Sequence, residues 1–173
     1  TLLDDPTSEL VPGSRVSDDE GVNTKKMAMI ENGRVLNFFY DLQTSSEAGI
    51  ESTGNACRNV GTLPIPGASV SIICGGTSDY QEMVRDIKDG LVVECLLGAG
   101  QSNILGGDFN ANVLIGYRIS NGTIIGRVKN TVIAGNVYQA LKRIRSIENT
   151  CHWVGGTLKA PSMVLDGVSI STQ

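Results

Sequence analysis

Few residues of this 173-residue chain have side chains that could do chemistry. The single histidine, His152, lies between Cys151 and Trp153. A zinc site needs three or four ligands, and an isolated Cys-His pair cannot build one without distant help. A serine nucleophile needs a base, and His152 has no Gly-x-Ser-x-Gly sequence to accompany it. The residue types and their spacing alone therefore identify no catalytic residue and no metal ligand.

A glycine-rich stretch, residues 96–109, lies between two sequences typical of β-strands. It carries no charge before Asp108, and its glycines are Gly98, Gly100, Gly106 and Gly107. Glycine lets the backbone reach positive φ and lets other atoms approach closely. No Gly-Lys-Ser/Thr follows and no helix is expected to begin there, so a phosphate-binding loop is excluded. Two interpretations remain: the stretch covers the domain's own core, or it lines a binding site.

Two polar segments are the other candidates. Asp18-Asp19-Glu20-Gly21 forms an acidic turn, which could bind a cation or steer an amine. Carboxylates clustered in a turn are more commonly solvated, and that interpretation stays open beside the first. Residues 52–59 form a second polar loop, rich in turn-forming residues.

The elements that must position these residues are mostly strands. Asn32-Gly33 and Asn121-Gly122 each separate two β-prone runs, which is the strongest short hairpin signal because both residues tolerate positive φ. The runs that we interpret as strands are residues 1–5, 27–31, 34–40, 69–74, 91–97, 109–117, 117–120, 123–125 and the alternating tail 163–170.

Three helices are expected. One is capped by Asp41 or Thr44 and ends at Gly49; another begins at Ser78, which has Gln81 at capping-box spacing, and ends at Gly90. The third runs from Asn136 to about Ile147, where apolar residues recur at helical spacing. The fold class predicted is α+β: a predominantly antiparallel β-sheet, sandwich- or barrel-like, with two or three packed helices on one side.

Composition limits the partners. The net charge is −4, and the basic residues are scattered apart from Lys142, Arg143 and Arg145, which argues against direct nucleic-acid binding. Four cysteines without a CxxC pair predict free thiols in a reducing compartment. No apolar run has the length of a membrane span. We expect a cytoplasmic protein without a membrane partner.

Because the chain opens inside a strand, we interpret residues 1–173 as a single domain cut from a longer protein whose N-terminal domain is absent.

Six short stretches, in this order, resemble one family. They are 13–15 with 18–21, 30–33, 52–55, 90–100 with 107–109, 119–122 and 133–136. The series resembles the C-terminal domain of the TldD/PmbA proteins, known as modulators of DNA gyrase and microcin-processing metallopeptidases. Each stretch is weak alone, but the whole series covers nearly all of the chain.

The resemblance implies a division of labour. In the TldD type, an N-terminal α/β region carries an HExxxH zinc motif, and a cysteine in a Cys-Gly-Lys-Glu-Gly-like run near the C-terminus adds a ligand. The PmbA type, also called TldE, lacks the zinc motif and pairs with TldD in a heterodimeric peptidase that trims unstructured peptides. Residues 150–161 contain no Cys-Gly-Lys-Glu-Gly run, so the chain is closer to the PmbA/TldE branch. We therefore assign no zinc ligand to Cys151 or His152.

The resulting hypothesis is a domain that shapes a peptide cleft without supplying zinc ligands. Zinc is possible in the full-length protein or its partner, and the partner is a TldD-type subunit or a second copy of the protein. The acidic turn (Asp18, Asp19, Glu20 and Gly21) is interpreted as structural. The cleft candidates are Ser52, Thr53, Gly54, Asn55, Arg58, Gly98, Gly100, Gly107 and Asp108. Two alternatives remain: a non-catalytic regulatory module acting on DNA gyrase or a toxin–antitoxin system, and a purely structural dimerisation domain.

Overall fold

The structure is a computed structural model that describes residues 1–103 and 105–172. The chain divides into two compact units. The first unit comprises residues 1–75 and 151–161, and the second comprises residues 76–150 and 162–173. The two divisions near the C-terminus fall within two long strands, Ile144–Val154 and Leu158–Leu165.

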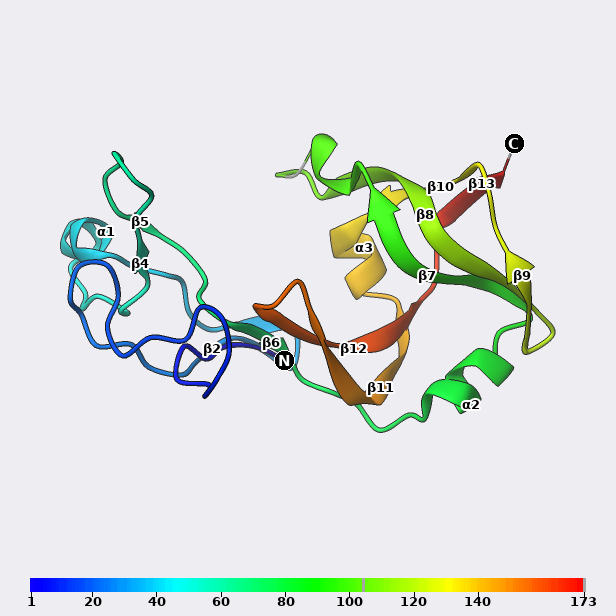
Figure 1. Cartoon of the computed structure of the whole chain (residues 1–173), viewed down its shortest axis with the longest axis horizontal. Coiled ribbons are helices and arrows are strands. Elements are labelled where there is room, and N and C mark those ends of the chain that lie inside the picture. The colour runs from blue at the N-terminus through cyan, green and yellow to red at the C-terminus, as the bar shows by residue number, and fades with distance from the viewer. Residues whose placement is uncertain (104, 173) are drawn as a thin grey trace. The chain divides into compact units, whose positions relative to one another are not determined.

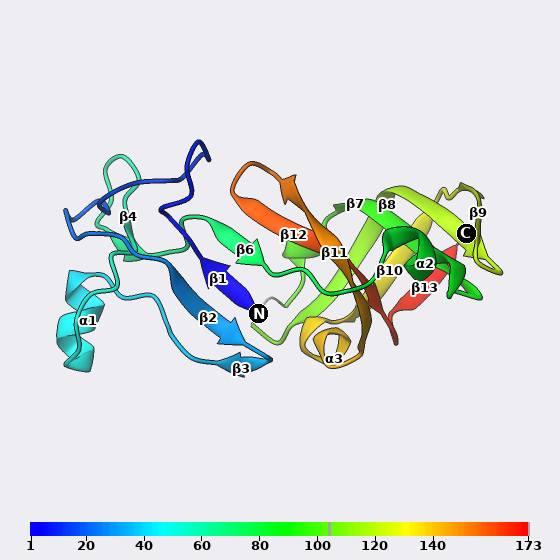
Figure 2. The same ribbon diagram turned by 90° about the horizontal axis from the view of Figure 1, so that it is seen from below.

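The first unit is built on a sheet in which β6, β1, β2 and β3 lie side by side (Figure 2). The full order of this sheet is β11-β12-β6-β1-β2-β3. Strand β12 pairs with β6 in parallel, whereas β1 is antiparallel to both of its neighbours. The elements are β1 (Leu2–Asp4), β2 (Met27–Glu31), β3 (Arg34–Val35), α1 (Leu42–Ala48), β4 (Ala56–Cys57), β5 (Ile65–Pro66), β6 (Ser71–Ile73), β11 (Ile144–Val154) and β12 (Leu158–Leu165).

Local sequence explains the hairpin and the helix of this unit. Asn32 and Gly33 have φ values of 49° and 79°, so the predicted hairpin turn between β2 and β3 is confirmed. The carboxylate of Asp41 accepts the amide of Thr44 and caps α1, which ends at Gly49 with a φ of 68°. This helix is also confirmed, with Asp41 as its cap.

In the first unit, buried carboxylates take part in the stabilisation that an apolar core usually provides. Asp4 is 1% exposed and accepts the backbone amides of Ser69 and Val70 at 2.9 and 3.0 Å. The buried apolar side chains of this unit are few, and those among the described residues are Pro6, Met27, Ala56, Val70 and Pro161. Charge-assisted hydrogen bonds to backbone amides thus supply part of the stabilisation that apolar packing gives elsewhere.

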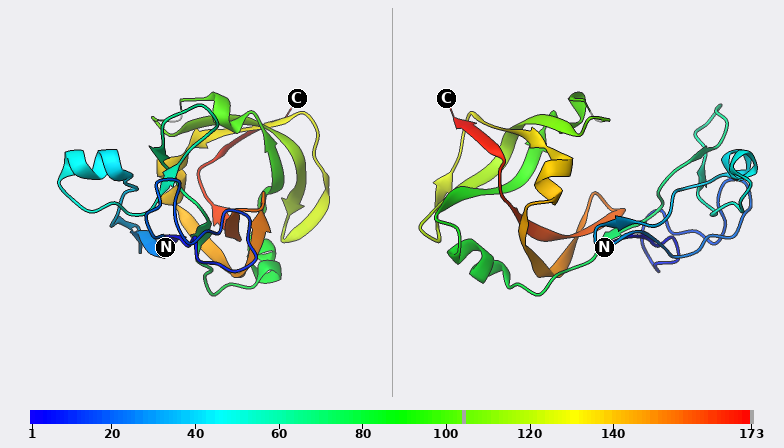
Figure 3. Two further views of the ribbon diagram at one scale, coloured as in Figure 1. Left: turned by 60° about the vertical axis from the view of Figure 1, so that its left-hand side comes forward. Right: turned by 180° about the vertical axis from the view of Figure 1, so that it is seen from behind.

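The second unit has a more usual apolar core. Its sheet has the order β13-β10-β8-β7, with β9 also paired to β8, and β8 curves along its length (Figure 3). Ala111, Val113 and Ile133 form the buried centre. Helix α3 lies against β10, and α2 lies next to β9 (Figure 1). The elements are α2 (Tyr80–Arg85), β7 (Asp89–Leu97), the 3-10 helix η1 (Ala99–Gln101), β8 (Asp108–Ser120), β9 (Thr123–Arg127), β10 (Thr131–Asn136), α3 (Val137–Leu141) and β13 (Ser169–Thr172).

Two helix boundaries differ from the sequence-based expectation. Helix α2 is capped by Asp79, because the backbone of Ser78 is hydrogen bonded to β11 through Ile147 and Asn149. Helix α3 does begin after Asn136, but it ends at Leu141 and strand β11 starts at Ile144. The apolar residues expected on one helix face are therefore divided between a short helix and a strand.

The predicted α+β class is confirmed: strands dominate, most pairings are antiparallel, and three α-helices accompany them in the described residues. The sheets of the described chain are open rather than closed into a barrel. All four cysteines are free thiols. Among the described residues, no helix has the length and apolar character needed to cross a membrane.

Candidate functional site

The acidic turn is a connector between two loops of the first unit. Asp18 is 6% exposed, and its Oδ1 accepts the amides of Glu20 and Val22 at 3.0 and 2.9 Å. Its Oδ2 accepts the amide of Ala56 at 2.9 Å, and Gly21 turns the chain with a φ of 82°. Both carboxylate oxygens of Asp18 are thus engaged by backbone amides.

The next two acidic residues extend the connection. Asp19 accepts the amide of Arg58 at 2.7 Å and lies 3.7 Å from the guanidinium of Arg15. Glu20 accepts the amide of Leu42, the first residue of α1, at 2.8 Å. The turn therefore organises the backbone around it, which is the role expected of a structural motif.

The polar loop that follows α1 is fixed mainly by its own polar groups. Ser52 and Thr53 both donate their hydroxyls to the carbonyl of Tyr40, at 3.0 and 3.1 Å. Gly54 has a φ of 73°, and a Cβ there would lie 2.4 Å from the carbonyl oxygen of Asn23. Asn55 is 1% exposed and donates to Asp4 at 2.7 Å. These contacts give Gly54 and Asn55 a structural role.

The first half of the glycine-rich stretch faces open space. Strand β7 ends at Leu97, and Gly98, with a φ of 86°, begins the turn into η1. A Cβ added to Gly98 or Gly100 would meet no atom of the described residues within 4 Å. The expectation that no helix begins there is corrected by η1, but its three residues are too short to act as an anion-binding helix end.

The second half of the stretch is fastened to α3. Asn136 donates its amide to the carbonyl of Gly106 at 2.7 Å and to the carboxylate of Asp108 at 2.8 Å. The same side chain caps α3 by accepting the amides of Tyr138 and Gln139. Sequence reasoning placed Asn136 at a helix start but missed that it holds the loop.

Gly107 is required at its position by close packing. A Cβ there would lie 2.5 Å from the ring of Tyr138, and the Gly107 carbonyl accepts the amide of Val137 at 2.7 Å. Two glycines of one stretch therefore have different functions: Gly107 packs, whereas Gly100 leaves the backbone accessible.

Strand β7 precedes the open half of the loop and lies at the edge of its sheet. Within the described residues, β7 pairs only with β8. It has nine residues without proline, lysine or arginine, and Val93, Leu96 and Leu97 are exposed on it. An edge strand presents unpaired N–H and C=O groups that can pair with another extended chain. Strand β7 is thus an edge strand whose register with β8 shifts between Val93 and Leu96, and it leads into the open turn at Gly98 and Gly100. An edge of this kind can pair with an extended peptide.

Tyr80 is an ionisable residue with a shifted pKa near this edge. Burial raises the pKa of the Tyr80 hydroxyl above its usual value, and the negative charges of Glu94 and Glu148 raise it further. Tyr80 therefore stays protonated at neutral pH. Among the described residues, no group of three His, Cys, Asp or Glu side chains is arranged to hold a metal ion. The Cys151 thiol donates to the carbonyl of Ile73 at 3.6 Å.

The predicted cleft residues fall into two groups. Ser52, Thr53, Gly54, Asn55 and Arg58 lie in the first unit, and Arg58 is the most exposed of them. Gly98, Gly100, Gly107 and Asp108 lie in the second. In the first group, Arg58 is joined to the acidic turn through its amide and Asp19, whereas Ser52 and Thr53 bond to Tyr40 and Asn55 bonds to Asp4. In the second group, Gly107 and Asp108 are joined to the start of α3.

Comparison with known proteins gives a consistent family assignment. Residues 1–172 match the family model described as the PmbA/TldA metallopeptidase C-terminal domain. An uncharacterized protein of Methanocaldococcus jannaschii is 29% identical over 99% of this chain and 39% of its own length. A metalloprotease of Methanothermobacter thermautotrophicus is 31% identical over 85% of this chain and 32% of its own length.

Solved structures agree. The crystal structure of TldE from Thermococcus kodakarensis is 30% identical, covers 99% of this chain and 39% of that chain, and has a TM-score of 0.89. A putative modulator of a DNA gyrase from Thermotoga maritima is 27% identical, covers 98% and 38% of the two chains, and has a TM-score of 0.85. The chain thus spans between 32% and 39% of the length of these relatives. It belongs to the PmbA/TldD metallopeptidase family and corresponds to its C-terminal domain.

Proposed function

We propose that this domain forms one wall of a peptide-binding cleft in a longer PmbA/TldD-family protein, and that this protein works with a TldD-type subunit to trim unstructured peptides. The observation that carries the proposal is the accessible backbone of β7 and its following turn. There the free sheet edge leads into Gly98 and Gly100, which have no described neighbour within 4 Å of a Cβ position. Backbone pairing recognises an extended chain whatever its side chains are.

In this proposal the domain positions the peptide, and hydrolysis takes place elsewhere. In this proposal zinc is held by the full-length protein's other part or by its partner, and no ligand is assigned to Cys151 or His152. Asp108, which lies in the second unit with β7, is the charged residue that we assign to the rim of the cleft. The proposal thus includes an N-terminal part of the full-length protein, an unstructured peptide as the substrate and a TldD-type protein as the second subunit.

The test is peptide trimming by the full-length protein together with a TldD-type subunit. Gly100→Val adds a branched side chain where no described atom obstructs it and where the backbone is not at positive φ. We expect this variant to keep its fold and to raise KM for unstructured peptides at least about tenfold, because the branched side chain shields the peptide-facing backbone.

A matched pair of alanine variants separates site effects from strain. Gly98 and Gly61 both have positive φ, at 86° and 79°, and both have open space at the Cβ position. Gly98→Ala and Gly61→Ala therefore carry the same backbone strain, but only the first lies at the proposed cleft. Equal trimming by both variants and by Gly100→Val would remove the cleft role and favour a purely structural dimerisation domain.

The second candidate function is a non-catalytic module that acts on DNA gyrase. The observation that favours it is the name of the Thermotoga maritima protein, a putative modulator of a DNA gyrase. A stable complex of the full-length protein with gyrase subunits at micromolar concentration, together with no trimming in the presence of a TldD-type subunit, would select this function over the first.

A further inference from the structure

The chain contains two Asn-Gly pairs, and each forms the turn of a β-hairpin. Asn32 and Gly33 have φ values of 49° and 79°, and Asn121 and Gly122 have nearly the same values, 48° and 74°. Both asparagines are exposed. The two turns therefore share their residue types, the left-handed backbone and access to water, so a comparison between them depends on what holds each turn in place.

An Asn-Gly pair carries its own modification chemistry. The glycine nitrogen gives up its proton and attacks the side-chain amide carbon of the asparagine. A C–N bond forms, and the side-chain nitrogen takes up a proton and leaves as ammonia. Water then opens the cyclic imide at either carbonyl, which gives aspartate or isoaspartate. Glycine has no Cβ to obstruct the attack. The attack also requires rotation about the Cα–C bond of the asparagine, so its rate depends on how easily the turn opens.

The turn at Asn121 is held against another segment of the second unit. The Asn121 amide donates to the carbonyl of Lys88 at 2.7 Å, and the Gly122 amide donates to the carbonyl of Ile87 at 2.8 Å. A Cβ on Gly122 would lie 2.5 Å from the carbonyl oxygen of Arg85. The nitrogen that would attack is therefore already a hydrogen-bond donor inside a packed contact.

The turn at Asn32 has much weaker support. Among the described residues, the Gly33 amide has no hydrogen-bond acceptor, and a Cβ on Gly33 would meet no atom within 4 Å. The Asn32 amide donates to the hydroxyl of Thr1 at 3.4 Å, which is long for a hydrogen bond. The attacking nitrogen at this turn is thus free and accessible.

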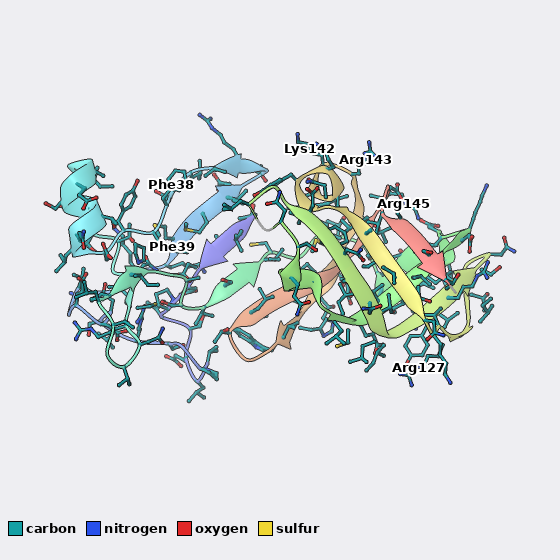
Figure 4. All side chains as sticks on the ribbon, turned by 90° about the horizontal axis from the view of Figure 1, so that it is seen from above. Phe38, Phe39, Arg127, Lys142, Arg143 and Arg145 are labelled. Atoms are coloured by element: carbon teal, nitrogen blue, oxygen red, sulfur yellow. The ribbon has the colours of Figure 1, made fainter. Side chains whose placement is uncertain are left out.

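The strand that follows the Asn32 turn is short. Strand β3 consists of Arg34 and Val35, both exposed, and it ends the strand order of its sheet. One backbone bond, from the Leu36 amide to the Met29 carbonyl, continues the pairing. Figure 4 shows the chain then running toward Phe38, away from the turn. A two-residue strand at the border of a sheet opens more easily than the centre of the sheet.

We propose that Asn32 is a spontaneous modification site, which converts in the folded protein to isoaspartate and aspartate through a cyclic imide with Gly33, whereas Asn121 reacts far more slowly. Water is the co-reactant, and ammonia is released. Isoaspartate adds one atom to the backbone of the turn and a negative charge next to Glu31, so the pairing of β2 with β3 is disturbed. The reaction depends on this hairpin alone and is independent of peptide binding at β7.

The experiment is ageing of the full-length protein at mildly alkaline pH, both folded in buffer and unfolded in guanidinium chloride. Peptide mass spectrometry measures the modified fraction at Asn32 and at Asn121 over time, and electron-transfer fragmentation distinguishes isoaspartate from aspartate. The ratio of the unfolded rate to the folded rate at each site measures the protection that the fold gives, and it removes the effect of neighbouring residue types. Asn121 is the matched control in every sample.

We expect the protection of Asn121 to exceed that of Asn32 by at least about tenfold, because two further hydrogen bonds must break before its turn opens. Isoaspartate should be the main product at Asn32, and the Leu36 amide should exchange its hydrogen faster in the modified fraction. A smaller difference in protection, or stronger protection of Asn32, would overturn the proposal. Aspartate as the sole product would also overturn it, because direct hydrolysis of the side chain yields no isoaspartate.

Discussion

Asp18 offers the sharpest test of how the first unit is held together. Its carboxylate accepts three backbone amides, and one of them belongs to Ala56, a residue with 0% exposure. A buried amide left without a partner costs about 1–3 kcal/mol, and each of the other two bonds contributes about 0.5–1.5 kcal/mol. Asp18→Ala is therefore expected to lower the local free energy of unfolding by about 3 kcal/mol.

The neighbouring acid provides a matched control. Asp19 has a half-exposed side chain, and its partners are the exposed amide of Arg58 and the guanidinium of Arg15 at 3.7 Å. Solvent screening limits such a pair to less than about 1 kcal/mol. Asp18→Asn should fall between the two at about 2 kcal/mol, because one oxygen remains for the turn while the Ala56 amide loses its acceptor.

Native-state hydrogen exchange of the full-length protein measures these differences. A loss of about 3 kcal/mol corresponds to amide exchange about 150-fold faster in the peptides that contain Ala56 and β4. We expect Asp19→Ala to accelerate the same peptides less than about fivefold. The interpretation of Asp18 as a structural connector is refuted if Asp18→Ala and Asp19→Ala accelerate exchange equally.

Two further predictions concern side chains that cap helices. Asn136→Ala removes the bonds to Gly106 and Asp108 and the cap of α3, which should cost about 1–2 kcal/mol. Amide exchange in the described residues between Gly98 and Asp108 should therefore be about 5- to 30-fold faster, with little change in β9. The amide and hydroxyl of Thr44 hold the pKa of the Asp41 carboxyl below its usual value. The stabilisation that this carboxylate gives the folded protein is therefore complete above about pH 4, and it is lost as the pH falls through the lowered pKa. Urea midpoints at pH 3 and pH 6 should therefore differ less for Asp41→Asn, which keeps a capping side chain, than for the natural sequence.

Much of the fold was predictable because local signals agreed with tertiary structure. Asn121-Gly122 has φ values of 48° and 74° and forms the turn between β8 and β9, as the dipeptide predicts. Residues 136–147 show the opposite case. Their apolar spacing fits a helix, but Ile144 and Ile147 are β-branched and join a strand that pairs with β12. Pairing with the next strand along the chain decided between two locally acceptable structures.

The candidate site was predictable only in outline. The density of glycine predicted the loop after β7, but Gly100 and Gly107 are the same residue type and could not be told apart from the sequence. Their surroundings differ because a Cβ on Gly107 would lie against the ring of Tyr138, whereas a Cβ on Gly100 would meet no described atom within 4 Å beyond its chain neighbours. Likewise, the burial of Asn55 against Asp4 depends on residues that are far apart in the chain, so residue type alone could not predict it.

The division of labour between this domain and the zinc-bearing part of the assembly is the central claim, and zinc content measures it directly. The full-length protein is purified with a TldD-type subunit, and the zinc bound per pair is determined for the natural sequence and for the double variant Cys151→Ser, His152→Ala. We predict that both preparations bind the same amount of zinc. Loss of bound zinc from the double variant, with the pair still assembled, would contradict the claim that this domain supplies no metal ligand.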